Sequence, residues 1–410
     1  MPYTHAPGLT GVADPAAPPA AASAPPRVPV ERRVAPVPLA SFARTLWRVA
    51  RARTSAGNAV ALLRDGPATY DAMRALVAGA RETVDLESYI LRDDEVGEEI
   101  ATVLREAVGR GVRVRLLTDW IGARGISRRW VDGLRRDGIQ VAMFNPPAFR
   151  SRWFGLLPRD HRKLLVVDGA AGVIGGVGIG REWKPGPGAT AGTQWRDTAV
   201  RISGPAGDDM GRAFEAMWQR AHRRRWRRPP RVQQPAPEHV EPPAPAARVA
   251  IVEGDPLRFR VARAFQLHAL TARRSIWIAD AYFMPNFGEL ETLVGAARDG
   301  VDVRVLVPSM SDHRWMLGIT RRYYHRLLAA GVRVFEWSGA MMHAKTTVID
   351  GHLMRVGSTD FNPLGMGINF ELDAVIEDAA LGAEAEAMFV ADIEQSQEIT
   401  SVPGWIRRRE

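Results

Sequence analysis

One pattern occurs twice in this chain, as His161-Arg-Lys163-Leu-Leu-Val-Val-Asp168 and as His343-Ala-Lys345-Thr-Thr-Val-Ile-Asp350. Both copies read H-x-K-x-x-x-x-D. Each continues through an apolar run to a turn of small residues, Gly-Gly in the first copy and Gly-Ser in the second, which begins 14 residues after the histidine. The same internal spacing in both copies indicates a duplicated unit.

The residue types in this pattern suit phosphoryl chemistry. In a strand, residues i and i+2 point to the same face, so each motif histidine projects together with its lysine. Two such pairs facing each other would form a pocket with two imidazoles and two ammonium groups. The ammonium groups can bind phosphate oxygens, while one imidazole attacks phosphorus and the other protonates the leaving oxygen. The alternative is two ordinary buried strands, although lysine is rarely buried without a partner.

The chain resembles the phospholipase D superfamily, and within it the bacterial cardiolipin synthase branch, from about Asn58 to the C-terminus. Besides the two motifs, three segments are similar to that branch: Leu86–Asp94, Trp195–Pro205 and Asn369–Glu371. The resemblance implies an α/β fold of two duplicated α/β/α sandwich halves, related by a pseudo-twofold axis, with the active site at their interface. No cofactor or metal is expected, because the lysines supply the positive charge.

The resemblance also implies roles for the site residues. His161 would be the nucleophile and His343 the general acid, in two displacements through a phosphohistidine. A carboxylate downstream of each motif would fix the tautomer of an imidazole, and the residues at the matching positions are Asp197 and Glu371. The alternative is that these two are surface carboxylates.

Four further residues are predicted to contact the substrate: Gly176, Ser358, Asp360 and Asn362. The family pattern has an asparagine three residues after the start of each small-residue turn, where this chain has Gly178 and Asp360. A carboxylate at position 360 facing the phosphate would repel it unless the group is protonated or turned away. Asn362 is the candidate substitute.

The last residue of each motif is predicted to be structural. Asp168 and Asp350 each precede a glycine at a strand end, and we expect them to hold these turns by local hydrogen bonds to the backbone.

Composition limits the partners and the compartment. The 410 residues are enough for two domains, and 55 basic against 46 acidic residues give a net charge of +9. Anionic partners are therefore expected. The chain lacks cysteine, and it contains no apolar run long enough to span a bilayer and no signal-like start. We expect a peripheral membrane protein on the cytoplasmic face of the bacterial inner membrane, with phospholipids and an anionic membrane surface as partners rather than nucleic acid.

Patterning along the chain predicts five regions: a disordered arm at 1–37, a basic amphipathic helix at 38–56, a first half at 57–228, a Pro-rich linker at 229–246 and a second half at 247–410. The amphipathic helix has Leu39, Leu46 and Val49 on one face and Arg44 and Arg48 on the other. It could pack on the first half or lie on a membrane surface.

Strands alternate with helices in both halves, which indicates parallel α/β units. In the first half the predicted strands are 84–90, 112–119, 141–145 and 163–168, with helices at 95–110 and 127–137. In the second half the predicted strands are 275–282, 301–308 and 332–337, with helices at 287–299 and 315–330.

A loop upstream of the first motif combines aromatic and aliphatic residues with arginines. It contains four candidate membrane contacts: Trp153, Phe154, Leu156 and Leu157. The alternative is a loop folded over the pocket. Arginine clusters with a tryptophan occur at 223–228 and 405–409, and these could bind an acidic leaflet or single-stranded nucleic acid.

The sequence therefore predicts a phosphatidyltransferase of the cardiolipin synthase type, with phosphatidylglycerol as donor. A hydrolytic phospholipase D and a nuclease or phosphodiesterase of the same superfamily are the alternatives.

Overall fold

The computed structural model describes residues 39–146, 157–184, 193–222 and 246–401, with the backbone alone at 39–42. Several predictions therefore lie outside the described residues: those for the arm, for most of the linker, for both arginine clusters, and for Trp153, Phe154 and Leu156.

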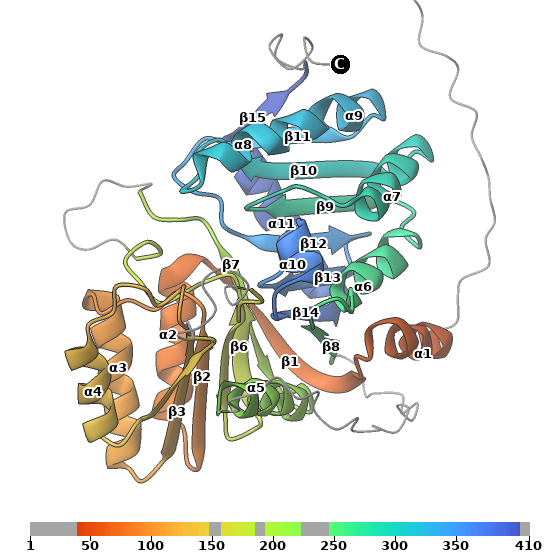
Figure 1. Ribbon diagram of the computed structural model, residues 1–410. Coiled ribbons are helices and arrows are strands. Elements are labelled where there is room, and N and C mark those ends of the chain that lie inside the picture. Colours follow the sequence, from red (N-terminus) through yellow and green to blue (C-terminus); the bar gives the residue numbers. More distant parts are fainter. Residues whose placement is uncertain (1–38, 147–156, 185–192, 223–245, 402–410) are drawn as a thin grey trace, which may run out of the picture. The chain divides into compact units, whose positions relative to one another are not determined.

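The described residues form one fifteen-stranded sheet with helices on both faces (Figure 1). The elements of the first half are α1 (Leu39–Ala50), β1 (Thr54–Arg64), α2 (Asp65–Ala78), β2 (Thr83–Ser88), α3 (Glu95–Gly109), β3 (Arg113–Asp119), α4 (Arg128–Arg136), β4 (Gln140–Phe144), β5 (Lys163–Val167), β6 (Ala171–Gly175), β7 (Thr198–Ser203) and α5 (Ala206–His222).

The elements of the second half are β8 (Ala247–Gly254), α6 (Arg260–Ala269), β9 (Ser275–Asp280), α7 (Phe287–Arg298), β10 (Asp302–Pro308), α8 (Arg314–Thr320), η1 (Arg321–Tyr323), α9 (Tyr324–Ala329), β11 (Arg333–Trp337), β12 (Lys345–Ile349), β13 (Leu353–Gly357), α10 (Pro363–Gly367), β14 (Glu371–Glu377), α11 (Ala379–Ile393) and β15 (Ser396–Ile399).

The strand order repeats across the middle of the sheet. From the centre outward the first half runs β1-β7-β6-β5-β2-β3-β4, and the second runs β8-β14-β13-β12-β9-β10-β11 with β15 at the edge. In the first half β2, β3 and β4 are parallel, and in the second half β9, β10 and β11 are parallel. All other neighbouring strands, including β15 with β11, pair antiparallel. The predicted duplicated α/β fold is confirmed, and the antiparallel pair β1–β8 joins the halves into one sheet.

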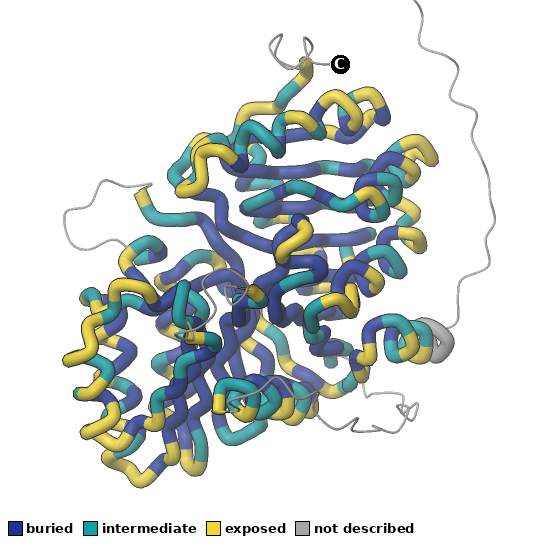
Figure 2. Tube along the Cα trace, in the orientation of Figure 1, coloured by how far each residue is buried: buried dark blue, intermediate teal, exposed yellow. Residues whose placement is uncertain are grey.

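Helices cover the buried strands on both faces (Figure 2). On one face, α2 and α3 pack on the first half, and α6 and α7 on the second. On the other face, α5 and α11 share a core with strands of both halves. Two of the covering helices begin at polar caps: the carboxylate of Asp94 accepts hydrogen bonds from the first turn of α3, and that of Asp378 accepts one from the first turn of α11.

Three details differ from the sequence prediction. The helix predicted at 38–56 ends at Ala50, and Thr54 already belongs to β1. Leu46 of this helix is buried in the same apolar cluster as α6, which α1 contacts, so α1 packs on the second half rather than on the first. The helix predicted at 315–330 is divided into α8, η1 and α9.

Candidate active site

His161 lies just before β5 and is held by the second half. Its backbone N–H donates to the carbonyl of Phe370 at 2.9 Å. Its side-chain Nδ1 lies 3.1 Å from both carboxylate oxygens of Glu371, at the start of β14. The hydroxyl of Ser358 also donates to Glu371. Burial raises the pKa of the Glu371 carboxyl well above its usual value.

His343 lies just before β12 and is held by the first half in the same way. Its N–H donates to the carbonyl of Arg196 at 2.7 Å, and its Nδ1 lies 2.7 Å from Oδ2 of Asp197. The indole Nε1 of Trp183 donates to the same oxygen at 2.8 Å. Burial raises the pKa of Asp197 to about 6. Each carboxylate therefore serves the histidine of the opposite half, an exchange that the sequence did not indicate.

Both motif lysines point back toward their histidines. Lys163 Nζ donates to the carbonyl of His161 at 2.7 Å, and Lys345 Nζ donates to that of His343 at 2.6 Å. Burial, and then the charge of Lys345, lower the pKa of Lys163 to about 8. The charge of Lys345 thus disfavours the charged form of Lys163, and a bound anion would offset this repulsion.

The two imidazoles are not equivalent. Burial, and then the nearest lysine in each case, hold the pKa of both His161 and His343 well below the usual value. Each neutral ring therefore keeps its proton on Nδ1, toward its carboxylate, and a lone pair on Nε2. On His343 this nitrogen lies 3.1 Å from the ammonium of Lys345. On His161 it has no hydrogen-bond partner among the described residues, and this side chain is 13% exposed against 3% for His343.

Two tyrosines without a role predicted from the sequence, Tyr89 and Tyr282, flank the site. The ring of Tyr89 lies 4.7 Å from that of His161, and the ring of Tyr282 lies 6.1 Å from that of His343. Each motif lysine also lies over one of these rings, at 5.5 and 5.6 Å. Both follow the strand that pairs with a motif strand, a position that marks them as candidates.

Glycine is required sterically at two positions of the first half, Gly176 and Gly178. A Cβ at Gly176 would lie 2.2 Å from a carboxylate oxygen of Asp197, so only glycine allows that approach. A Cβ at Gly178 would lie 2.7 Å from the ring of Trp183. The indole therefore fills the space beside the position where the family pattern has asparagine, and it also packs edge-on against His343.

In the second half, the position equivalent to Gly178 is occupied by Asp360. Asp360 is buried, and its Oδ1 lies 3.3 Å from Nζ of Lys345 without a hydrogen-bond partner among the described residues. Asn362 does not replace the missing asparagine. Its side chain accepts from the N–H of Gly365 and donates to the carbonyl of Tyr282, so it caps α10.

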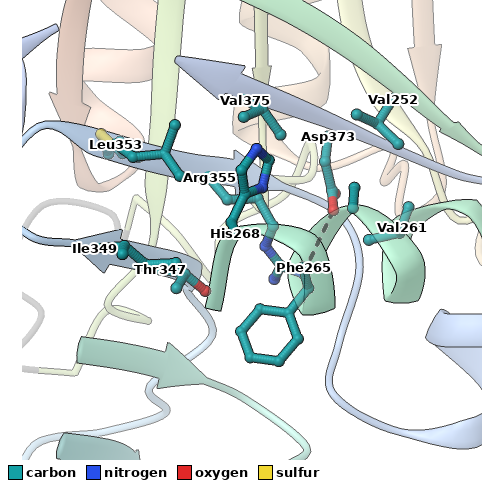
Figure 3. Close-up of a pocket in the computed structure, with 12 residues that line it drawn as sticks. Val252, Val261, Phe265, His268, Thr347, Ile349, Leu353, Arg355, Asp373 and Val375 are labelled. Carbon is teal, nitrogen blue, oxygen red and sulfur yellow. Dashed lines mark ion pairs between the residues drawn. The ribbon is translucent and has the colours of Figure 1, made fainter. Parts of the chain in front are cut away.

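A buried ion pair fixes the backbone next to Asp360. Arg355 and Asp373 lie 3.5 Å apart beside a small cavity that His268 also lines (Figure 3). The carboxylate of Asp373 accepts hydrogen bonds from the N–H and the hydroxyl of Thr359. The guanidinium of Arg355 donates to the backbone carbonyl of Thr359. The pair thus fixes the backbone between Ser358 and Asp360.

A second buried network holds the Asp197 segment. Arg196 pairs with Asp392 of α11 at 2.7 Å and with Asp65 at 3.2 Å. Asp65 also accepts a hydrogen bond from the N–H of Asp197. The carboxylate that orients His343 is therefore fixed by residues of both halves.

The motif aspartates bind backbone amides, but not local ones. Asp168 accepts from the N–H groups of residues 81–83, and Asp350 from those of residues 273–275. They fix the starts of β2 and β9, the strands paired with the motif strands, and lie away from the histidines.

Leu157 is the one predicted membrane contact that the structure describes, and it is exposed. Within the described ranges, no group of three or more histidine, aspartate or glutamate side chains is arranged as a metal site. No helix in the same ranges is long and apolar enough to cross a membrane.

Comparison with known proteins identifies the family of this chain. The family model described as "Cardiolipin synthase, PLD-like domain" matches residues 73–183 and 268–393. The chain belongs to this family. Cardiolipin synthase A of Pseudomonas putida is 32% identical over 362 residues, which are 87% of this chain and 73% of that protein. Cardiolipin synthase A of Pseudomonas aeruginosa is 31% identical over 358 residues, which are 87% and 71% of the two chains.

Solved structures show the same fold. Phosphatidylserine synthase of Haemophilus influenzae superposes with a TM-score of 0.65 at 14% identity, over 88% of this chain and 92% of that one. Polyphosphate kinase of Porphyromonas gingivalis gives 0.56 at 13% identity, over 83% and 48%. The resemblance predicted from the sequence is confirmed: the chain is a phospholipase D-superfamily enzyme of the cardiolipin synthase-like family.

Proposed function

We propose that the protein is a phosphatidyltransferase of the cardiolipin synthase type. It takes a phosphatidyl group from phosphatidylglycerol onto His161 and passes it to a hydroxyl of a second lipid. The observation that carries the proposal is the exchanged pair of imidazole–carboxylate contacts, His161 with Glu371 and His343 with Asp197, beside two buried lysines. The lipid class comes from the names of the relatives.

In the first displacement, the lone pair on Nε2 of His161 attacks phosphorus, and the bond from phosphorus to the headgroup oxygen breaks. Glu371 accepts the Nδ1–H of His161, so it stabilises the positive charge that develops on this ring. The two ammonium groups stabilise the charge on the phosphoryl oxygens.

The leaving oxygen takes a proton from Nε2 of His343. The neutral ring gains this proton when the phosphodiester binds, because the bound anion offsets the lysine charges that hold the pKa of His343 down. The protonated Nε2 no longer accepts from the ammonium of Lys345, which is then available to a phosphoryl oxygen. In the second displacement, the incoming hydroxyl returns a proton to Nε2 of His343 and attacks phosphorus. The bond from phosphorus to His161 breaks, and both residues regain their initial states.

Water can replace the alcohol in the second step, which would make the enzyme a hydrolytic phospholipase D. Transfer requires a site closed to water. The lysines and His343 are almost fully buried, which favours transfer. We place the protein at the cytoplasmic face of the inner membrane, where an alcohol of a second lipid is at hand.

The test incubates purified protein with phosphatidylglycerol vesicles and reads the products by lipid mass spectrometry. His161→Ala is the matched control. Cardiolipin from the wild type alone supports the proposal. Phosphatidic acid instead assigns hydrolysis, and a wild-type-like yield from His161→Ala excludes the nucleophile. If no lipid product forms, the transfer reaction is wrong, and single-stranded DNA is the next substrate.

A further inference from the structure

Most of the exposed large apolar side chains lie in segments next to the strand ends that carry the active site. Among the described residues eight large ones are exposed, and seven of these lie in the segments next to strand ends at the active site. One of the seven, Phe287 at the start of α7, has the guanidinium of Arg326 over its ring. The other six, here called the apolar rim, are Leu157, Leu257, Phe259, Met310, Trp315 and Leu364. The eighth, Leu270, lies at the opposite edge, between α6 and the start of β9.

The topology explains why the rim surrounds the site. β8 ends at Gly254, which pairs with Glu371, so the segment with Leu257 and Phe259 leaves the sheet beside the site. α10, which carries Leu364, connects the end of β13 to Glu371. Met310 follows β10, and the same loop contacts the site because Tyr282 donates to Asp312.

The backbone holds two rim residues in a costly conformation. Leu257 and Phe259 have φ values of 60° and 50°, in the left-handed region that residues other than glycine rarely occupy. The N–H of Leu257 donates to the carbonyl of Gly367 at 2.7 Å, and a Cβ on Gly367 would lie 2.5 Å from the ring of Phe259. The fold therefore maintains this strain, although Leu257 remains 77% exposed. Such strain points to a function.

Arginines lie between the rim residues. Arg258 stands between Leu257 and Phe259, and Arg314 precedes Trp315; both arginines are exposed. Exposed aromatic and aliphatic side chains interleaved with arginines are typical of surfaces that lie on anionic lipid. We propose that the apolar rim docks this edge of the protein onto the surface of an anionic phospholipid bilayer.

His161 is the one member of the two histidine–lysine pairs with an appreciably exposed side chain, and it lies at this edge, beside the start of β14. A phospholipid keeps its acyl chains in the bilayer, so its phosphate can reach His161 only if this edge approaches the membrane. This step deepens the proposed lipid function and rests on it, whereas vesicle binding can be measured without turnover.

The experiment uses the full chain and sucrose-loaded vesicles of phosphatidylglycerol and phosphatidylcholine, read by co-sedimentation. Two double variants remove separate parts of the rim, Leu257→Ser with Phe259→Ser, and Met310→Ser with Trp315→Ser. The matched control is Leu270→Ser, because this leucine is 74% exposed at the opposite edge. We expect about tenfold weaker vesicle binding for each double variant and wild-type binding for the control.

Turnover of the soluble phosphodiester bis(p-nitrophenyl) phosphate reports folding and should stay at the wild-type rate in all variants. Equal vesicle binding by the wild type and both double variants would overturn the rim, as would an equal loss in the control. The proposal would also be overturned if the rim variants bound vesicles like the wild type but no longer sedimented as a dimer. That result would assign the surface to contact with a second copy of the chain. Rim-dependent binding without any lipid product would refute the proposed transfer but not the rim.

Discussion

The exchange of carboxylates between the halves can be tested by its dependence on the leaving group. Asp197 contacts His343, the proposed general acid, although it lies in the half of the nucleophile. Asp197→Asn keeps the shape of the side chain and removes its charge. We expect this variant to lose the protonation of the leaving oxygen while the attack by His161 persists.

The magnitude follows from the contact. The hydrogen bond from His343 to Asp197 is short, at 2.7 Å, and both side chains are almost fully buried. A hydrogen bond to a charged group contributes about 1.5–3 kcal/mol. Since about 1.4 kcal/mol corresponds to tenfold in rate, kcat on an alkyl phosphodiester should fall about 10- to 150-fold.

The assay compares two soluble substrates. p-Nitrophenolate leaves without much help from an acid, whereas an alkoxide needs a proton. Asp197→Asn should therefore retain most of its rate on bis(p-nitrophenyl) phosphate. Glu371→Gln is the matched control: Glu371 contacts the nucleophile His161, so this variant should lose rate on both substrates.

The opposite pattern would refute the exchange. If Glu371→Gln spared the p-nitrophenyl ester and Asp197→Asn did not, each carboxylate would act with the histidine of its own half. Equal losses on both substrates for both variants would mean that the carboxylates only hold the fold together.

Three further outcomes are expected. Asp360→Asn removes a carboxylate 3.3 Å from Lys345, so tungstate should bind about tenfold more tightly in calorimetry; unchanged or weaker binding would place the carboxylate away from the phosphate. Burial and the charge of Lys345 lower the pKa of Lys163 to about 8, so kcat/KM should fall as the pH rises through 8 and the ammonium loses its proton. Lys163→Arg should move this fall in kcat/KM to higher pH. If the fall stayed at the same pH in the variant, Lys163 would not be the group that titrates. Arg196→Met leaves the buried carboxylate of Asp392 without its bidentate partner, so denaturant titration should show a loss of about 3 kcal/mol in the free energy of unfolding; a loss below about 1 kcal/mol would contradict this.

The sequence predicted the elements of the outer sheet well, because their apolar periodicity and their repetition in the second half are local signals. It missed the inner strands β1, β6, β7, β8, β13 and β14, the edge strand β15, and the helices α2, α5, α6, α10 and α11. β1 and β8 are the pair at the centre of the sheet. β1 alternates small and polar residues with a few aliphatic ones, in the order Thr-Ser-Ala-Gly-Asn-Ala-Val-Ala-Leu-Leu-Arg. Its strand conformation depends on pairing with β7 and β8, both distant in sequence.

At the site, the sequence supplied the residue types but not their partners. The two motifs and both carboxylates were visible as patterns, yet contacts between residues 146 and 210 positions apart leave no local trace. Asn362 was assigned to the phosphate because only its position could be judged, whereas its amide caps α10. Trp183 left a signal that could have been used, since a bulky residue shortly after Gly178 can fill the space that a missing side chain leaves.

Two halves with the same strand order can still perform unlike steps, because the surroundings of their histidines differ. The ring of His343 packs against Trp183 and Trp195, and its Nε2 faces Lys345. A nitrogen that already accepts from an ammonium is a poor nucleophile but is well placed to pass a proton. His161 has a single aromatic neighbour among the described residues, Tyr89, and an Nε2 without a partner in the same ranges. The unpaired nitrogen belongs to the more exposed of the two histidines, and this supports His161 as the residue that attacks the phosphate.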